Sequence, residues 1–253
     1  MDERFANFPA LSKAIRELYR LFGRYPFRTD RHRDCFSAKG GPRFYCKRLE
    51  EFSGEDLRWC LPLSNVEDFK HFLPRLCELA AIDLITPITV PHDSSVSLWD
   101  LCVEFRYTQW HTWPNREQSA VHEFFLAFFN ASLGMYPGER PEEHVRDMGE
   151  TGVDVAILLH LWGEAKGLNA ALQLSDVIST QADNLFRLGG VRLGVERGAE
   201  AIDERFTAWL ARPERRMFLE EVFFQHPDGR NAEDMSDAIR TYDLWREAVA
   251  NKA

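Results

Sequence analysis

The segment NVEDFKHFLPRLCELAA, residues 65–81, holds three side chains that could bind an anion or transfer a proton: Lys70, His71 and Arg75. Histidine titrates near neutral pH, and lysine and arginine donate charge-assisted hydrogen bonds to carboxylates and phosphates. At 100° per residue, however, glutamates share this polar face, so ion pairs on a solvated helix surface explain the same pattern. The sequence leaves open whether the three residues face water or line a groove.

A second candidate is the basic segment at residues 24–48, where Arg28, Arg31 and Arg33 alternate with aromatic residues. Residues 16–48 carry a charge of +7, which leaves −16 for the rest of a chain whose net charge is −9. Such a segment could grip an anionic partner, with base stacking if that partner were nucleic acid. We favour pairing of these arginines with the acidic remainder, because the whole chain would repel a polyanion. Nucleic acid is therefore not the expected partner.

The stretch YTQWHTWPNRE places Tyr107, Trp110 and Trp113 within seven residues. If these rings are exposed, they form a partner-binding patch, since tryptophan and tyrosine dominate interface hot spots. If they are buried, they pin a helix corner ahead of Pro114. The buried alternative is the favoured one.

Standard catalytic and metal-binding motifs are absent from the sequence. There is no Gly-x-Ser-x-Gly elbow, no P-loop lysine, no Cys-x-x-Cys pair and no pair of Glu-x-x-His motifs. His160 and Glu164 could share a helix face, but two ligands do not hold a metal, and we interpret His160 as a hydrogen-bonded core histidine. We expect no metal and no cofactor. An enzyme site assembled from distant residues, using His71, His111 or Cys35, remains an alternative.

The elements that would position these residues are helices. Apolar residues recur at helical spacing along most of the chain and predict about ten of them. Pro9 is placed to begin a helix, and two helices are expected to join at Pro213. Ser53 with Asp56 resembles a capping box, and Thr151 and Asp154 can cap the run VAILLHLW. One helix is expected over about residues 168–188.

Pro74 interrupts the helical pattern of residues 65–81. A proline inside a helix lacks the amide proton and clashes with the carbonyl four residues earlier, here that of Lys70. By helical spacing Pro74 falls on the polar side, so we expect a solvent-facing kink, or a helix that ends and restarts there.

Together these patterns predict an all-α fold of about ten helices, in a compact irregular bundle or a solenoid-like stack of antiparallel helices. No repeat period is found, which favours the irregular bundle. We expect one domain over residues 1–253, with a long basic loop at about 24–52. No apolar run approaches the roughly 18 residues of a membrane span, and the first residues do not resemble a signal peptide, so a cytoplasmic location is expected.

Four segments together resemble a family of uncharacterised bacterial proteins that share a DFKHFLPR core: RLEEFSGEDLRWCLPLSNVEDFKHFLPRLCELA, WPNREQSAVHEFFLAFF, VAILLHLWGEAKG and FTAWLARPERRMFLEEVFF. The resemblance extends from about Tyr25 to Trp245. Members of that family often carry closely spaced cysteines after a Tyr-Pro element, whereas Cys35 and Cys46 have ten residues between them here. The resemblance implies a bacterial, cytoplasmic, helical protein, and it carries over no catalytic residue.

These observations favour a non-enzymatic module that binds a protein partner. The dispersed-site enzyme and an anion- or nucleic-acid-binding protein that uses residues 24–48 are the alternatives. The sequence does not indicate the oligomeric state.

Overall fold

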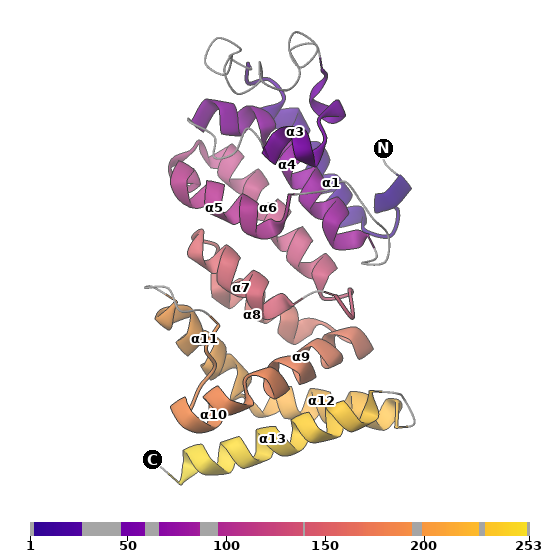
Figure 1. Cartoon of the computed structure of the whole chain (residues 1–253), viewed down its shortest axis with the longest axis vertical. Coiled ribbons are helices and arrows are strands. Elements are labelled where there is room, and N and C mark those ends of the chain that lie inside the picture. The colour runs from indigo at the N-terminus through magenta and orange to yellow at the C-terminus, as the bar shows by residue number, and fades with distance from the viewer. Residues whose placement is uncertain are drawn as a thin grey trace. The chain divides into compact units, whose positions relative to one another are not determined.

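The computed structural model describes residues 3–26, 47–58, 66–86, 96–138, 140–193, 199–227 and 231–251. In these ranges the chain forms twelve α-helices and three short 3-10 helices, with no strand (Figure 1). The predicted all-α fold of about ten helices is thus confirmed. Contacts divide the chain into two compact units, unit 1 at Met1–Ala131 and unit 2 at Ser132–Ala253, and each is described by itself. The single domain over residues 1–253 stays a prediction.

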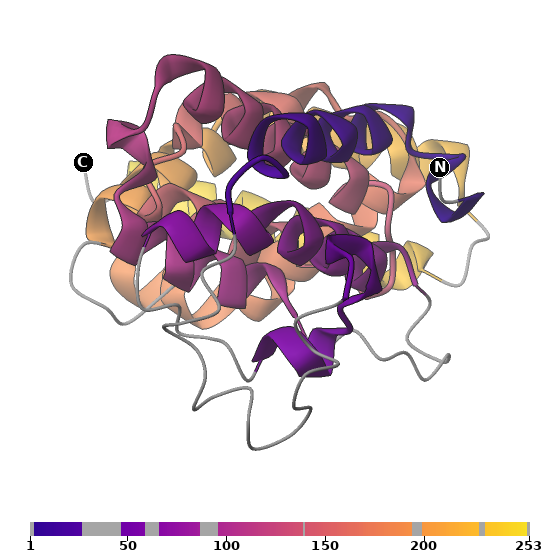
Figure 2. The ribbon, with the colours of Figure 1, turned by 90° about the horizontal axis from the view of Figure 1, so that it is seen from above.

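Unit 1 is built around one long helix, α4. Its described elements are η1 (Glu3–Phe5), α1 (Pro9–Phe22), η3 (Leu49–Glu51), α3 (Gly54–Arg58), α4 (Val66–Ile85), α5 (Leu98–Thr108), η4 (Trp110–Thr112) and α6 (Asn115–Ser132), whose last residue belongs to unit 2. Thirteen of the twenty residues of α4 are buried, because α1, α3 and α5 all pack against it. Figures 1 and 2 both show α1 running alongside α4.

Pro74 departs from its predicted environment. Helix α4 continues unbroken from Val66 to Ile85 with Pro74 inside it, and Pro74 is buried rather than facing solvent. Helical spacing puts Pro74 on the same side of α4 as His71, but it does not show that other segments cover this side. That polar side is covered by other chain segments, because His71 and Arg75 bond to the backbone carbonyls of Tyr25 and Phe52.

Several helix boundaries follow the predicted local signals. Pro9 is the first residue of α1, and Pro213 is the first residue of α12. The amide of Asp56 donates to the hydroxyl of Ser53 while the amide of Ser53 donates to the carboxylate of Asp56, which is the expected capping box. The Asp154 carboxylate accepts from the Ala156 amide at 2.9 Å and caps α8.

Unit 2 contains seven helices among its described residues: α7 (Pro141–Glu150), α8 (Val155–Glu164), α9 (Leu168–Thr180), α10 (Ala182–Leu188), α11 (Glu200–Leu210), α12 (Pro213–Gln225) and α13 (Ala232–Ala250). The single helix expected over residues 168–188 is two helices, α9 and α10. Helix α13 packs against α9, α10 and α12, and Figure 1 shows it along one side of them. Helix α8 packs against both α7 and α11.

Some predictions fall on residues outside the described ranges. These are the basic residues Arg28, Arg31 and Arg33, most of the loop at 24–52, and Cys35. Cys77 and Cys102, which are described, are both buried. No helix in the described ranges has both the length and the apolar character that a bilayer crossing requires.

Candidate functional site

Lys70 lies inside unit 1, in a buried ion pair. Its ammonium donates to Glu117 Oε2 at 2.6 Å, and the side chains of Lys70 and Glu117 are 9% and 2% exposed. The Tyr25 hydroxyl donates to the other oxygen, Glu117 Oε1, also at 2.6 Å. Burial and this hydrogen bond raise the pKa of Tyr25 to about 12, so the hydroxyl stays a proton donor at neutral pH. The Lys70 ammonium also lies 4.4 Å from the centroid of the Trp113 ring, a cation–π contact.

The other two candidates on α4 also make internal contacts. His71 Nδ1 lies 2.6 Å from the Tyr25 carbonyl oxygen, and burial lowers the pKa of His71 below its ordinary value of 6.5. Arg75 donates through Nε to the Phe52 carbonyl at 2.7 Å and through Nη1 to Glu78 at 2.6 Å. The Arg75–Glu78 pair is the expected i,i+3 pair, but it is mostly shielded from solvent. Lys70, His71 and Arg75 thus join α4 to neighbouring segments, and their binding role stays a prediction.

Trp110 and Trp113 do not form an exposed patch. They are 6% and 5% exposed and pack edge to face or tilted against Phe105 of α5. The Trp113 indole donates to the Thr108 carbonyl at 3.2 Å. The favoured alternative, a buried helix corner, describes these two rings, while Tyr107 is 77% exposed.

A cavity of unit 2 lies between α8 and the junction of α11 with α12. Its volume is about 370 Å³. The side chains that line it are mainly basic or small, and they are Ala156, Leu159, His160, Gly163, Glu164, Arg205, Ala208, Trp209, Arg212 and Arg215. We call it the arginine pocket. Among these lining residues are three arginines and one histidine but a single carboxylate residue, Glu164, so the charged side chains of the lining are mainly positive.

Arg215 is the most unusual residue of the arginine pocket. It is half-buried, and its guanidinium lies over the Trp209 ring with 4.8 Å between the guanidinium carbon and the ring centroid. Its buried Nε has no hydrogen-bond partner among the described residues. Burial lowers the pKa of Arg215 from its ordinary value, and the neighbouring Arg212 lowers it further, while the charges of Glu214 and Glu164 act in the opposite direction. Arginine is nevertheless protonated in proteins, so the charge remains.

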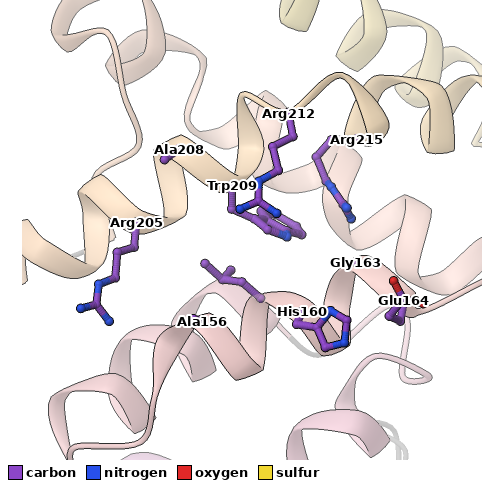
Figure 3. Close-up of a pocket in the computed structure, with 10 residues that line it drawn as sticks. Ala156, His160, Gly163, Glu164, Arg205, Ala208, Trp209, Arg212 and Arg215 are labelled. Carbon is purple, nitrogen blue, oxygen red and sulfur yellow. The ribbon is translucent and has the colours of Figure 1, made fainter.

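The other charged residues of the arginine pocket come from both of its walls. Figure 3 shows Arg212 and Arg215 directed from the α11–α12 junction toward α8, where His160 and Glu164 lie. Arg205 points away from the other two, and its guanidinium lies 3.7 Å from Asp154.

Our interpretation of His160 as a core histidine is wrong. The residue is exposed, because it lies on the pocket side of α8 rather than on the side formed by Leu158 and Trp162.

An aromatic core holds the two walls of the arginine pocket together. Trp162 of α8 lies 5.2 Å from Trp209 and 5.8 Å from Phe206, both of α11, measured between ring centroids. All three are buried. Gly163 follows Trp162, and a Cβ atom there would lie 2.9 Å from both terminal nitrogens of Arg215. The absence of a side chain at Gly163 therefore gives the Arg215 guanidinium its space.

The chemistry of the arginine pocket is that of an anion receptor. Guanidinium groups donate paired hydrogen bonds to carboxylate or phosphate oxygens, and an imidazole can add another. Within the described ranges, no group of three or more His, Cys, Asp or Glu side chains could hold a metal ion. His111, a candidate for the dispersed-site enzyme, is exposed on η4.

Comparison of the chain with protein-family models, with curated proteins and with solved structures gives no match. The resemblance to proteins with a DFKHFLPR core stays a prediction.

Arg212, Arg215, Trp209 and Gly163 were not predicted as site residues from the sequence. The signal that could have found them is the segment WLARPERR at residues 209–216, in which arginines surround a helix-starting proline next to a tryptophan. This segment alone does not predict a pocket, because the opposite wall of the arginine pocket is formed by α8.

Proposed function

We propose that the protein is a non-enzymatic binding module and that the arginine pocket takes an anionic group of its ligand. The observation that carries this proposal is the half-buried Arg215, whose Nε has no partner among the described residues at the wall of a basic cavity. A buried charge is costly unless it is paired, so an anion in the cavity would offset part of that cost.

Two further observations support the proposal, one on the neighbouring Arg212 and one on the net charge of the chain. The Arg212 side chain forms no ion pair or hydrogen bond with the described residues, so its guanidinium is available to a ligand. The negative charge of the chain does not oppose a small anion as it opposes a polyanion, because charges more than about 10 Å away are screened at 0.1 M salt.

Calorimetric titration in low-salt buffer with inorganic phosphate, sulfate and acetate tests the proposal. The wild type is expected to bind at least one of these anions at one site per chain. Replacing Arg215 with Met keeps an unbranched apolar chain and removes the charge. A charge-assisted hydrogen bond contributes roughly 1.5–3 kcal/mol, so we expect affinity to fall about ten- to hundredfold.

Arg240→Met is the matched control. Arg240 is an exposed arginine on α13 that does not line the arginine pocket, so its loss removes the same charge from unit 2 without touching the site. Equal losses of affinity in Arg215→Met and Arg240→Met, or no anion binding by the wild type, would reject the proposal.

We also propose that the partner carrying the anionic group is a protein, as the sequence favours. Met217 and Phe224 of α12 support this: they are 62% and 68% exposed and stand seven residues apart, on one side of the helix. Large apolar side chains at this spacing are the anchors that a partner's groove buries. Light scattering after size exclusion at native concentration should reveal a complex that Phe224→Ser disrupts, whereas a lone 29.4-kDa chain argues against it. The bacterial source and cytoplasmic location remain part of this proposal.

A further inference from the structure

Resting on the proposed anion-binding function, we infer that the arginine pocket selects a phosphate monoester over a carboxylate, with Gly163 as the positioning residue for Arg215. The shared chemistry of the ligand is a terminal phosphate with three free oxygens. Such a group occurs on small phosphate esters and on phosphorylated side chains of proteins.

The directions of the donors favour a tetrahedral group. Arg212 and Arg215 are directed from the α11–α12 junction toward α8, and His160 is a lining residue that belongs to α8 (Figure 3). Donors on two facing walls do not lie in one plane. A phosphate monoester presents three acceptor oxygens in three directions, whereas the two oxygens of a carboxylate lie in one plane. A carboxylate can therefore accept hydrogen bonds well from the donors of one wall, whereas a phosphate can accept them from the donors of both walls.

The charges of the pocket point to the same ligand. Asp154 lies near Arg205, and the carboxylates whose charges act on Arg215 are Glu214 and then Glu164, of which Glu164 lines the pocket. A phosphate monoester carries about −1.5 to −2 at pH 7, more than a monocarboxylate, and so compensates both guanidiniums of the α11–α12 junction. The cavity of about 370 Å³ lies near the lower end of the roughly 300–1,000 Å³ range of small-molecule sites. It therefore suits a phosphate with a small substituent.

Gly163 sets the position of the Arg215 fork. A Cβ atom at Gly163 would lie 2.9 Å from both Nη1 and Nη2 of Arg215, closer than van der Waals contact allows. The guanidinium is the end of a flexible chain, so it would move aside at little cost to the fold. Alanine also favours a helix over glycine. Gly163→Ala is thus expected to displace the binding group without destabilising the protein.

Calorimetry with methyl phosphate, dimethyl phosphate and acetate tests the inference on the full chain. Methyl phosphate is the dianionic monoester, dimethyl phosphate is tetrahedral but singly charged, and acetate is the planar carboxylate. We expect methyl phosphate to bind at least tenfold more tightly than either of the others. Gly163→Ala should weaken methyl phosphate binding about tenfold while the melting temperature is unchanged or higher. Arg215→Lys, which keeps the charge and loses the fork, should weaken it similarly.

The outcomes separate this inference from the function on which it rests. If acetate binds as tightly as methyl phosphate, the monoester inference fails and the anion-binding function stands. If no anion binds, the proposed function fails first. If Gly163→Ala binds like the wild type, Gly163 is not a positioning residue. A blocked phosphoserine peptide and glucose 6-phosphate form the last arm: tighter binding of either one than of methyl phosphate supports the inference and identifies the source of the phosphate.

Discussion

At the scale of single residues, the Lys70–Glu117 pair is the clearest stabilising contact of unit 1. Removing one partner of a buried ion pair leaves the other charge uncompensated, which costs roughly 3–5 kcal/mol. We expect Lys70→Met to lower the free energy of unfolding by about 3 kcal/mol, near the lower bound because Tyr25 still donates to Glu117 and the Arg24 guanidinium lies 3.5 Å from it. Urea denaturation monitored by circular dichroism measures this loss.

A double variant provides the control for that prediction. Lys70→Met combined with Glu117→Gln removes both charges, so it should recover part of the stability that Lys70→Met loses. A double variant that is no more stable than Lys70→Met would show that the buried charge of Glu117 is not the cause.

His71 makes the stability of the protein depend on pH. Because burial holds its pKa below 6.5, the unfolded chain takes up the proton more readily than the folded one. The stabilising effect is therefore complete above pH 6.5 and is lost as the pH falls through the folded-state pKa. His71→Gln, which keeps a side-chain donor for the Tyr25 carbonyl, should lose less stability than the wild type between pH 7.5 and pH 5. Urea midpoints at the two pH values measure the difference, and identical losses would contradict it.

At the scale of elements, helix α8 depends on its N-terminal cap. The Asp154 carboxylate accepts the Ala156 amide hydrogen, and an N-cap replaced by alanine costs about 1 kcal/mol. Asp154→Ala should lower the melting temperature, while Asp154→Asn should retain most of the stability, because asparagine caps as well as aspartate. Differential scanning calorimetry distinguishes the two variants. Equal melting temperatures would indicate that the cap contributes little.

At the scale of the whole molecule, helix boundaries could be predicted from the sequence where residues close by in the chain determine them. Helix starts at Pro9, Pro213 and Asp154 follow from backbone chemistry within a few residues, so they could be predicted. The break between α9 and α10 at Gln181 carries no glycine or proline, so the two were predicted as one helix.

The surroundings of the candidate residues could not be predicted, because they come from distant parts of the chain. Helical spacing puts His71 on the polar side of α4, but it does not reveal the partners of Lys70 and His71, because Glu117 and Tyr25 are 47 and 46 residues away. The arginine pocket likewise joins α8 to the α11–α12 junction. Periodicity shows which face of a helix is polar, and only tertiary packing shows what covers it.

The central claim is that the Arg215 guanidinium binds an anion in the arginine pocket. Its most direct test is a phosphate titration followed by NMR of the arginine Nε–H groups, with the Arg215 signal assigned from Arg215→Lys. We predict that the Arg215 signal shifts and saturates at the concentration given by calorimetry, while that of Arg240 stays in place. An Arg215 signal that does not move, or that moves no more than that of Arg240, would contradict the claim.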